Sequence, residues 1–202
     1  MTNVEEHELK DRLKLIETMI AEGRRTTESW GWVFILWGLA YYVATAWAAW
    51  GHTYLAWPVT MIASCVLTGA LISHKMHVQP KTTIGRAIGS VWIAMGISMF
   101  VLFFSLGWSG RFEYHTFIAI VGAMLGTANA TSSLILRWKM QFACAVIWWA
   151  STVAACFGSA TQTTIAFLVA TFFCQIVFGI YGMIAESRKE KPSEPRQGAV
   201  HA

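Results

Sequence analysis

The sequence predicts an all-α membrane protein with six transmembrane helices. Of its 202 residues, 55% are hydrophobic and only 13% are charged, whereas about a quarter of the residues in soluble domains are charged. Six apolar stretches each approach the length of about 20 residues that crosses a bilayer. Because none of them has Asp, Glu, Lys or Arg in its interior, none has the polar face of a soluble amphipathic helix.

The predicted spans follow one another with short connections, except for the longer link at residues 74–86. They cover residues 31–50, 54–73, 87–107, 114–136, 141–159 and 163–185. In lipid the backbone must satisfy its own hydrogen bonds, and short alternating strands are absent, so helices are expected. Because short connections make sequential helices antiparallel neighbours, we expect three antiparallel hairpins packed side by side.

The basic residues predict how the chain is oriented in the membrane. Fourteen of the fifteen Lys and Arg residues precede the first span, follow the last, or lie between spans two and three or four and five. Arg111 alone lies in a connection on the other side. The positive-inside rule therefore predicts that both termini are cytoplasmic. The net charge of +4 follows from this topology and indicates no nucleic-acid partner, only a basic rim that attracts anionic lipids.

Residues 4–22 predict a separate amphipathic helix on the cytoplasmic side. Its apolar residues recur at four-three-four spacing and share one face: Leu9, Leu13, Ile16 and Ile20. Leu15 and Met19 widen this stripe, and Gly23 is expected to end the helix. Either the helix lies along the membrane surface or covers the inner end of the bundle, or it self-associates or docks to a protein partner. Two heptads are too short to predict a stable coiled coil alone.

The chain is therefore expected to have three parts. Residues 1–29 form the amphipathic helix and a linker, and residues 30–186 form the transmembrane domain. Residues 187–202, which contain KEKPSEPRQG, are expected to be a disordered tail because they are polar and contain proline.

Polar side chains inside the spans are the candidate functional residues. Three of them lie at similar depth in spans two, four and six: Thr68, Asn129 and Gln175. Three tryptophans lie at comparable depth in spans one, three and five: Trp37, Trp92 and Trp148. An indole N–H buried there needs an acceptor, which an amide carbonyl can supply. This layer either holds the helices together by hydrogen bonds or lines a polar pocket.

Other tryptophans and small residues predict architecture. Gly122, Gly126 and Ala130 form a small-xxx-small pattern on the fourth span, which lets helix backbones approach closely. Tryptophans near the span ends predict an aromatic belt at the two membrane interfaces. The inner residues are Trp30, Trp32 and Trp138, and the outer residues are Trp47, Trp50, Trp57 and Trp108.

No pattern in the sequence indicates catalysis. It has no phosphate-binding loop, HExxH motif or serine elbow, and the spans have no charged residue of the kind that marks proton relays. The four cysteines are expected to be packing residues. Two histidine pairs are weak metal-site candidates that lack a nearby carboxylate or cysteine ligand: His52 with His115, and His74 with His77. We expect no enzyme activity and no bound metal or cofactor.

The order of features resembles a group of uncharacterised bacterial six-span membrane proteins. The resemblance lies in LKLIETMI, the aromatic first span around WG, and the WP that opens the second span. The matching residues are Leu13, Leu15, Ile16, Met19, Ile20, Trp37, Gly38, Trp57 and Pro58. The likeness is best over spans one to three and thins out after about residue 110. It implies the six-span topology and a bacterial inner membrane, and it implies no activity, cofactor or ligand.

Together these observations favour a non-catalytic scaffold, assembly factor or regulatory subunit. The N-terminal helix and the basic inner rim are its expected partner-facing surfaces. One alternative is a channel or carrier for a small neutral or hydrophobic solute that uses the layer of Asn129 and Gln175. A second alternative is an electron-transfer subunit that binds a cofactor.

Overall fold

A computed structural model describes residues 3–51, 55–75 and 83–190 of the chain. This part of the chain contains helices and no strand. The elements are α1 (Asn3–Ser29), α2 (Gly31–Gly51), α3 (Ala56–Lys75), α4 (Thr83–Ser109), α5 (Tyr114–Leu136), α6 (Lys139–Phe157), α7 (Ala160–Thr171), η1 (Phe172–Val177) and α8 (Phe178–Glu190).

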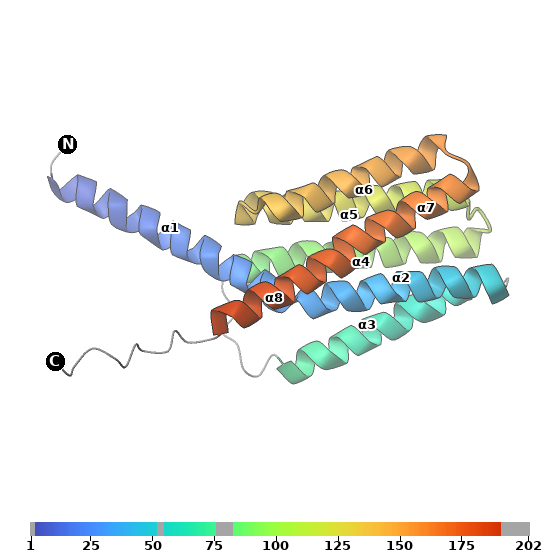
Figure 1. The fold of residues 1–202 in the computed structure, drawn as a ribbon, viewed down its shortest axis with the longest axis horizontal. Coiled ribbons are helices and arrows are strands. Elements are labelled where there is room, and N and C mark those ends of the chain that lie inside the picture. The colour runs from blue at the N-terminus through green and yellow to red at the C-terminus, as the bar shows by residue number, and fades with distance from the viewer. Residues whose placement is uncertain (1–2, 52–54, 76–82, 191–202) are drawn as a thin grey trace, which may run out of the picture.

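Six helical segments in the described residues are long and apolar enough to cross a membrane. They are α2, α3, α4, α5, α6 and the continuous helix formed by α7, η1 and α8. The predicted all-α fold is confirmed, and the six long apolar helices fit the six predicted spans, with bounds that differ by a few residues. The spans run alongside one another, with α7–α8 crossing obliquely over α2 (Figure 1). We call the end where α2 begins and α8 ends the basic end.

Contacts between the spans are uneven. The pairs α2–α3, α4–α5 and α6–α7 each pack together, but the most extensive contact is that of α5 with α6, which belong to different predicted hairpins. The α2 helix also packs along η1 and α8. The bundle is therefore held mainly by α5, α6 and the last span, whereas α3 and α4 lie toward its periphery.

Helices continue through two of the positions where the sequence predicts a boundary. Gly23 does not end the first helix, since α1 continues to Ser29. A Cβ on Gly23 would lie 2.5 Å from Ile84 Cγ2 and 3.0 Å from Leu136 Cδ2, so this glycine permits a close helix crossing. At the other end, α8 continues to Glu190, past the predicted start of the tail at residue 187. Residues 191–202 lie outside the described residues.

The ends of α5 and α7 are closed by local hydrogen bonds. Glu113 caps α5 by accepting hydrogen bonds from the backbone N–H groups of His115 and Thr116, at 3.0 and 2.6 Å. Ser159 and Gln162 form a capping box at the start of α7, in which each side chain satisfies a backbone N–H of the other residue. Both caps lie at the end of the bundle opposite the basic end, where the connections are short.

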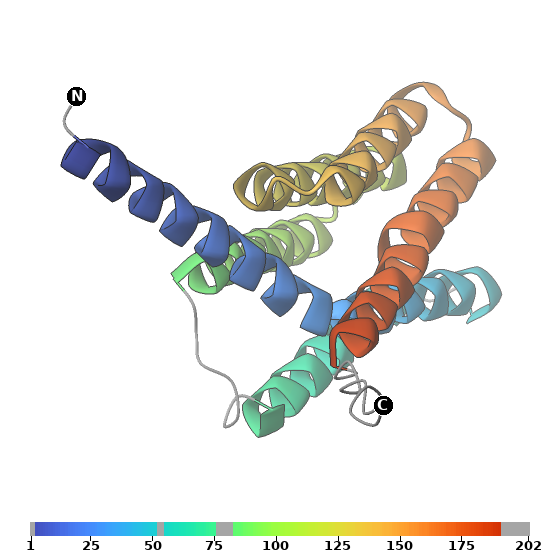
Figure 2. The same cartoon turned by 60° about the vertical axis from the view of Figure 1, so that its left-hand side comes forward.

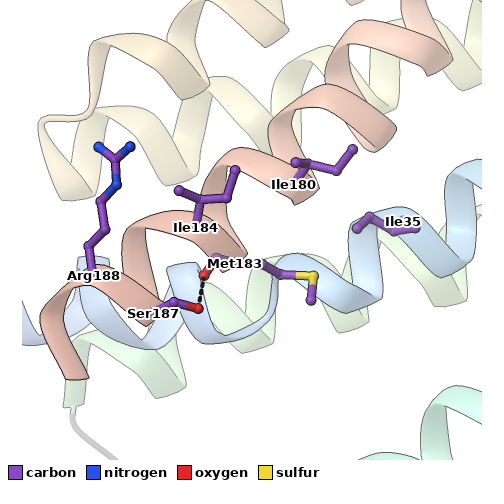
Figure 3. Close-up of a pocket in the computed structure, with 6 residues that line it drawn as sticks. All are labelled: Ile35, Ile180, Met183, Ile184, Ser187 and Arg188. Atoms are coloured by element: carbon purple, nitrogen blue, oxygen red, sulfur yellow. Dashed lines mark hydrogen bonds between the residues drawn. The ribbon is translucent and has the colours of Figure 1, made fainter. Parts of the chain in front are cut away.

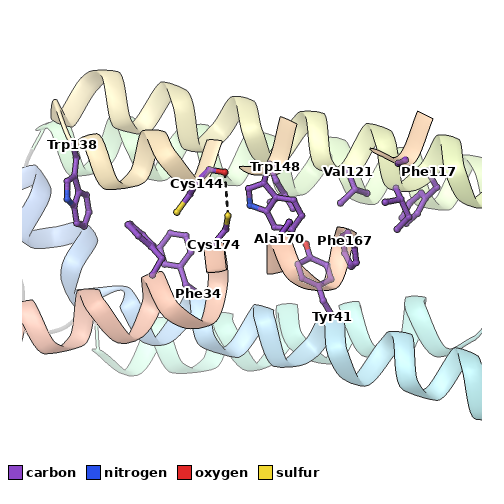
Figure 4. Close-up of a cluster of buried hydrophobic side chains, with 14 of the residues drawn as sticks. Phe34, Tyr41, Phe117, Val121, Trp138, Cys144, Trp148, Phe167, Ala170 and Cys174 are labelled. Carbon is purple, nitrogen blue, oxygen red and sulfur yellow. Dashed lines mark hydrogen bonds between the residues drawn. The ribbon is translucent and has the colours of Figure 1, made fainter. Parts of the chain in front are cut away.

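The core consists largely of aromatic side chains between α2, α5, α6 and the last span (Figure 4). Tyr41 and Trp148 both lie against Phe167, with ring centroids 5.5 and 5.8 Å apart. Trp138, predicted in the interfacial belt, is instead buried, with 6% of its surface exposed. Its ring packs on Phe178, so it belongs to the core.

Candidate functional site

The first candidate site is the part of α1 that precedes Ile20 and extends away from the bundle. This helix leaves the basic end of the bundle obliquely and extends beyond the ends of the spans (Figures 1 and 2). Leu9, Leu13 and Ile16 are 49%, 54% and 52% exposed, whereas Ile20 is half-buried where the helix meets the bundle. The predicted stripe is thus covered only at its C-terminal end. We call Leu9, Leu13, Ile16 and Ile20 the α1 stripe.

The root of α1 is anchored on three other helices. It packs on α4, α5 and α8. The Arg24 side chain donates hydrogen bonds from Nη2 to the carbonyl oxygens of Leu136 and Arg137, at 3.2 and 3.0 Å. These atoms belong to the C-terminal end of α5, where a cation is favourable. The Arg24 guanidinium also lies 5.8 Å from the ring centroid of Trp138, within range of a cation–π interaction.

Arg24 is a site residue that the sequence does not identify. In the sequence it is one of the basic residues of the inner rim, and its acceptors lie more than 100 positions away in the chain. A second feature of this region is also not predictable from the sequence. Arg137, which follows α5, adopts the left-handed conformation with φ 49°. Helix C-termini commonly end on such a residue, usually glycine. The sequence gives no sign that Arg137 takes that role.

The second candidate site is a set of buried polar side chains in the interior of the bundle. Asn129 is fully buried, and its Nδ2 donates to the carbonyl of Leu125 on its own helix, at 2.9 Å. Its Oδ1 has no hydrogen-bond partner. Gln175 is 2% exposed, and its Oε1 likewise has no partner. Neither amide therefore bonds to the other in the part of the chain that the structure describes.

The predicted tryptophans take three different environments. Trp92 donates its indole N–H to the hydroxyl of Ser132, at 3.1 Å, which links α4 to α5. Trp148 is fully buried, and its Nε1 has no hydrogen-bond partner. Trp37 is half-buried and packs beside Tyr41, with ring centroids 6.2 Å apart. The acceptor found for Trp92 is thus a serine hydroxyl rather than an amide.

Sequence reasoning missed two further buried side chains with unpartnered polar atoms, Gln141 and Ser151. Thr171 beside Gln175 is also buried with an unpartnered hydroxyl, and the half-buried Arg24 has an unpartnered Nε. Gln141 is fully buried with both polar atoms unpartnered. It stands at the predicted start of a span, where a polar residue is expected to face the interface. Gln141 is spaced three, seven and ten residues from Cys144, Trp148 and Ser151, and all four share the buried face of α6. This helical spacing could have predicted that Gln141 is buried. Thr68 on α3 is half-buried, and its Oγ1 also has no partner.

The last span contains a π-helical turn next to these groups. In η1 the N–H of Phe178 bonds to the carbonyl of Phe173, five residues earlier. The turn presents Cys174 to α6, where its Sγ donates to the carbonyl of Cys144 at 3.4 Å (Figure 4). Gln175 faces α2, since a Cβ on Gly38 would lie 2.9 Å from Gln175 Cβ. Single π turns are frequent at functional sites, and this one contains both Cys174, which bonds to α6, and Gln175, which lies against α2.

The predicted packing residues of α5 are all buried. Gly122, Gly126 and Ala130 lie on its interior face. A Cβ on Gly122 would lie 2.6 Å from Thr152 Oγ1 and 3.2 Å from the Trp148 carbonyl oxygen, and one on Gly126 would overlap the Trp149 ring. The absence of side chains at these two positions allows the close approach of α5 and α6. The Thr152 hydroxyl donates to the Ala119 carbonyl across the same interface, at 3.2 Å.

A pocket of about 500 Å³ lies on the surface between α2 and α8, near the basic end (Figure 3). Its walls are apolar, with Ile35 from α2 and Ile180, Met183 and Ile184 from α8. Ser187 and Arg188 complete it, and the Ser187 hydroxyl is bonded to the Met183 carbonyl at 3.0 Å. In a membrane such an open apolar pocket faces lipid chains, and the guanidinium favours anionic headgroups.

The histidines do not form a metal centre in the described residues. His115 Nδ1 lies 3.2 Å from the Ala155 carbonyl oxygen and 3.1 Å from Thr163 Oγ1, so it joins α5 to α6 and α7 by hydrogen bonding. His52, His77 and the side chain of His74 lie outside the described residues. Within the described residues, no three His, Cys, Asp or Glu side chains gather closely enough to hold a metal ion, and all four cysteines are free.

Both candidate sites belong to an all-α chain whose six long apolar helices fit a multi-pass membrane protein. No protein family matches the chain, no curated protein is similar to it in sequence, and no solved structure is similar to it in fold. The likeness to uncharacterised bacterial six-span proteins therefore stays a prediction. The two sites themselves are therefore the evidence that bears on function.

Proposed function

We propose that this chain is a non-catalytic assembly protein of a bacterial inner membrane, which gathers its partners through the cytoplasmic part of α1. The observation that supports this is the exposure of the α1 stripe. Leu9, Leu13 and Ile16 are about half exposed on a helix that extends beyond the ends of the spans. Large apolar side chains in lipid need no cover, but a contiguous apolar surface in water marks an interaction site.

The direction of α1 favours a protein partner over the membrane surface. The helix continues outward from the basic end instead of folding back across it (Figures 1 and 2). An interfacial helix lies in the plane of the headgroups with its apolar face in the lipid. At about 1.5 Å per residue, Leu9 is far up the helix from its anchor at Gly23 and Arg24. The anchor holds α1 in this direction, so the stripe is presented to the cytoplasm.

The test compares two substitutions on opposite faces of α1. Leu13→Glu places a charge in the α1 stripe, and Thr18→Glu places the same charge on an exposed position away from it. We expect lysine-directed cross-linking in intact cell membranes to yield complexes with the wild type and with Thr18→Glu but to lose them with Leu13→Glu. Equal cross-linking of the two variants would show that the stripe is not the contact. Thermal unfolding of both purified variants in detergent checks that the bundle is intact.

A second function is favoured by the polar atoms without partners in the bundle interior. In a bilayer an unsatisfied polar group costs several kcal/mol, so waters or a small neutral solute would satisfy Asn129, Gln141 and Gln175. This supports a pathway for a small neutral solute. Its test is the permeability of proteoliposomes to water and glycerol, with Gln175→Leu as the site variant and Ser98→Leu on the exposed face of α4 as the control. Permeability equal to that of empty liposomes would exclude this function for both probes.

A further inference from the structure

The α1 stripe has the positions of a coiled-coil seam. In a heptad, d is followed by a after four residues and a by d after three. Leu9 and Ile16 then take d positions, and Leu13 and Ile20 take a positions. The seam ends where α1 reaches the bundle, because the next d position is Gly23, which packs on Ile84 and Leu136.

The residues beside the seam have complementary charges. The charged g positions are Glu5 and Arg12, and the e positions beside Leu9 and Ile16 are Lys10 and Glu17. The remaining g position along the seam is Met19, and Arg24 at the next e position is bonded to the end of α5. In a parallel pair of helices, each g residue faces the e residue five positions later on the other helix. Glu5 then meets Lys10 of the second copy, and Arg12 meets Glu17 of the second copy. These two pairs, each of which two identical helices form twice, are between opposite charges.

The membrane allows only the parallel arrangement. Copies inserted with one topology present α1 on the same side and in the same direction. Confinement to a bilayer also raises their effective concentration, which compensates for a short seam. The root of α1 crosses α4, and α4 is the least buried span. A second bundle can therefore approach the first copy on the side of α4.

We propose that the α1 stripe pairs with the α1 stripe of a second copy of this chain, as a parallel, in-register coiled coil selected by the Glu5–Lys10 and Arg12–Glu17 contacts. This rests on the proposed function, since it names the partner of the same surface. Lys10 and Arg12 also pair with Glu6 and Glu8 on their own helix, at 2.7 and 2.5 Å. Such exposed pairs are weak, so they orient the cations beside the seam without withdrawing them from a partner.

The first experiment is disulfide cross-linking of the full chain, purified and reconstituted alone in liposomes. Ile16→Cys is placed in the seam, and Thr18→Cys on the opposite face is its matched control. We expect mild oxidation to give a covalent dimer with Ile16→Cys and none above the wild-type background with Thr18→Cys. Equal dimer yields from the two variants, or none from either, would overturn the pairing.

The second experiment exchanges charges across the interface. Arg12→Glu places a carboxylate against Glu17 of the second copy, and we expect the dimer Kd in liposomes to rise roughly threefold to tenfold. The double variant Arg12→Glu with Glu17→Arg restores opposite charges, and we expect the wild-type Kd to return. The Arg12–Glu8 pair within the helix is lost in both variants, so recovery reports only the contact between copies. No recovery in the double variant would overturn the proposed register.

The two proposals fail in distinguishable ways. In one outcome, the purified chains do not self-associate, but complexes in cell membranes still depend on Leu13. That outcome would refute pairing with a second copy and leave the assembly role intact. Loss of both results would refute both. Self-association that survives Leu13→Glu would place the contact between copies outside α1 and would refute the coiled coil, whereas the assembly role would still be decided by the cross-linking in cell membranes.

Discussion

The helices α4 and α5 are neighbours of similar length, yet they differ in what they bury. Both are apolar enough to cross a membrane, and the mean hydropathy of α4 is the higher. Within the apolar window of each span, however, 56% of α5 is buried and only 6% of α4. The large side chains of α4, such as Ile93, Ile97 and Val101, are more than half exposed. The interior of α5 contains Gly122, Asn129 and other small or polar residues.

This difference inverts the rule for soluble proteins. In water, apolar side chains are buried because water is a poor solvent for them. Lipid tails are as apolar as leucine, so apolarity does not decide which side of a membrane helix faces inward. Which side faces inward is decided instead by hydrogen bonds between helices and by how closely their backbones can approach. The high hydropathy of α4 therefore indicates a face toward lipid, and the small and polar residues of α5 indicate a helix interface.

The largest expected effect comes from filling the space of a glycine on α5. The Cβ of Gly122→Val would lie 2.6 Å from Thr152 Oγ1 and 3.2 Å from a backbone oxygen of α6. Overpacking of this kind costs about 1–3 kcal/mol. Gly96→Val on α4 is the matched control, because nothing lies within 4 Å of its Cβ. We expect it to change stability by less than about 0.5 kcal/mol. Thermal unfolding of both variants in the same detergent measures the two changes in stability. Equal losses would contradict the difference in packing between α4 and α5.

The next effect concerns how α5 is held at the basic end. Arg24→Ala removes the hydrogen bonds to the Leu136 and Arg137 carbonyls. Because hydrogen bonds to charged groups are stronger than neutral ones, and Arg24 is only half-buried, we expect a loss of about 1–2 kcal/mol. Arg25→Ala removes an exposed neighbour of the same charge and is expected to be nearly neutral. Similar melting temperatures for the two variants would show that the α5 end does not depend on Arg24.

The difference between α4 and α5 also shows what the sequence predicts well. Span length and the absence of charge set the six spans to within a few residues, because both are properties of a single segment. The pattern of Gly122, Gly126 and Ala130 lies on one helix and is equally local. Features that depend on two distant segments are not predictable in this way. Gly23 has the sequence context of a helix end, although it is a crossing point with Ile84.

Each candidate site likewise has some features that local sequence predicts and others that depend on distant segments. The α1 stripe follows from local spacing, but its direction away from the bundle depends on how Arg24 and Gly23 pack on α4 and α5. Gln141 escapes prediction because its burial depends on which helices cover α6. The place of Trp138 in the chain predicts a position at the membrane interface. Its burial results from Phe178 and Arg24, which come from opposite ends of the sequence.

A smaller effect tests the polar interior of α5. Asn129→Leu removes an amide whose Oδ1 has no partner and whose Nδ2 bonds only within its own helix. If the site is dry, the loss of an unsatisfied buried oxygen stabilises the protein by about 1 kcal/mol. Thermal unfolding in detergent shows whether the substitution raises or lowers the stability of the protein. A decrease in stability would show that water or a solute satisfies Asn129, and it would strengthen the second proposed function.

The smallest effect is a pH dependence at the opposite end of α5. The pKa of the Glu113 carboxyl is lowered from its ordinary value, first by the side-chain hydrogen bond of Thr116 and then by the backbone N–H of Thr116. Since the folded-state pKa is lowered, the cap stabilises the protein fully above the ordinary glutamate pKa. This contribution is lost as the pH falls through the lowered pKa.

Glu113→Gln measures this contribution directly. We expect the melting temperature of the variant to lie below that of the wild type at neutral pH, because the cap loses its charge at the positive end of the helix dipole. The two melting temperatures should converge as the medium becomes acidic and the wild-type carboxyl is protonated. Glu22→Gln, at an exposed position of α1, controls for the loss of a surface charge. A difference that persists unchanged in acid would show that the charge of Glu113 does not stabilise α5, and that α5 depends on its buried interface alone.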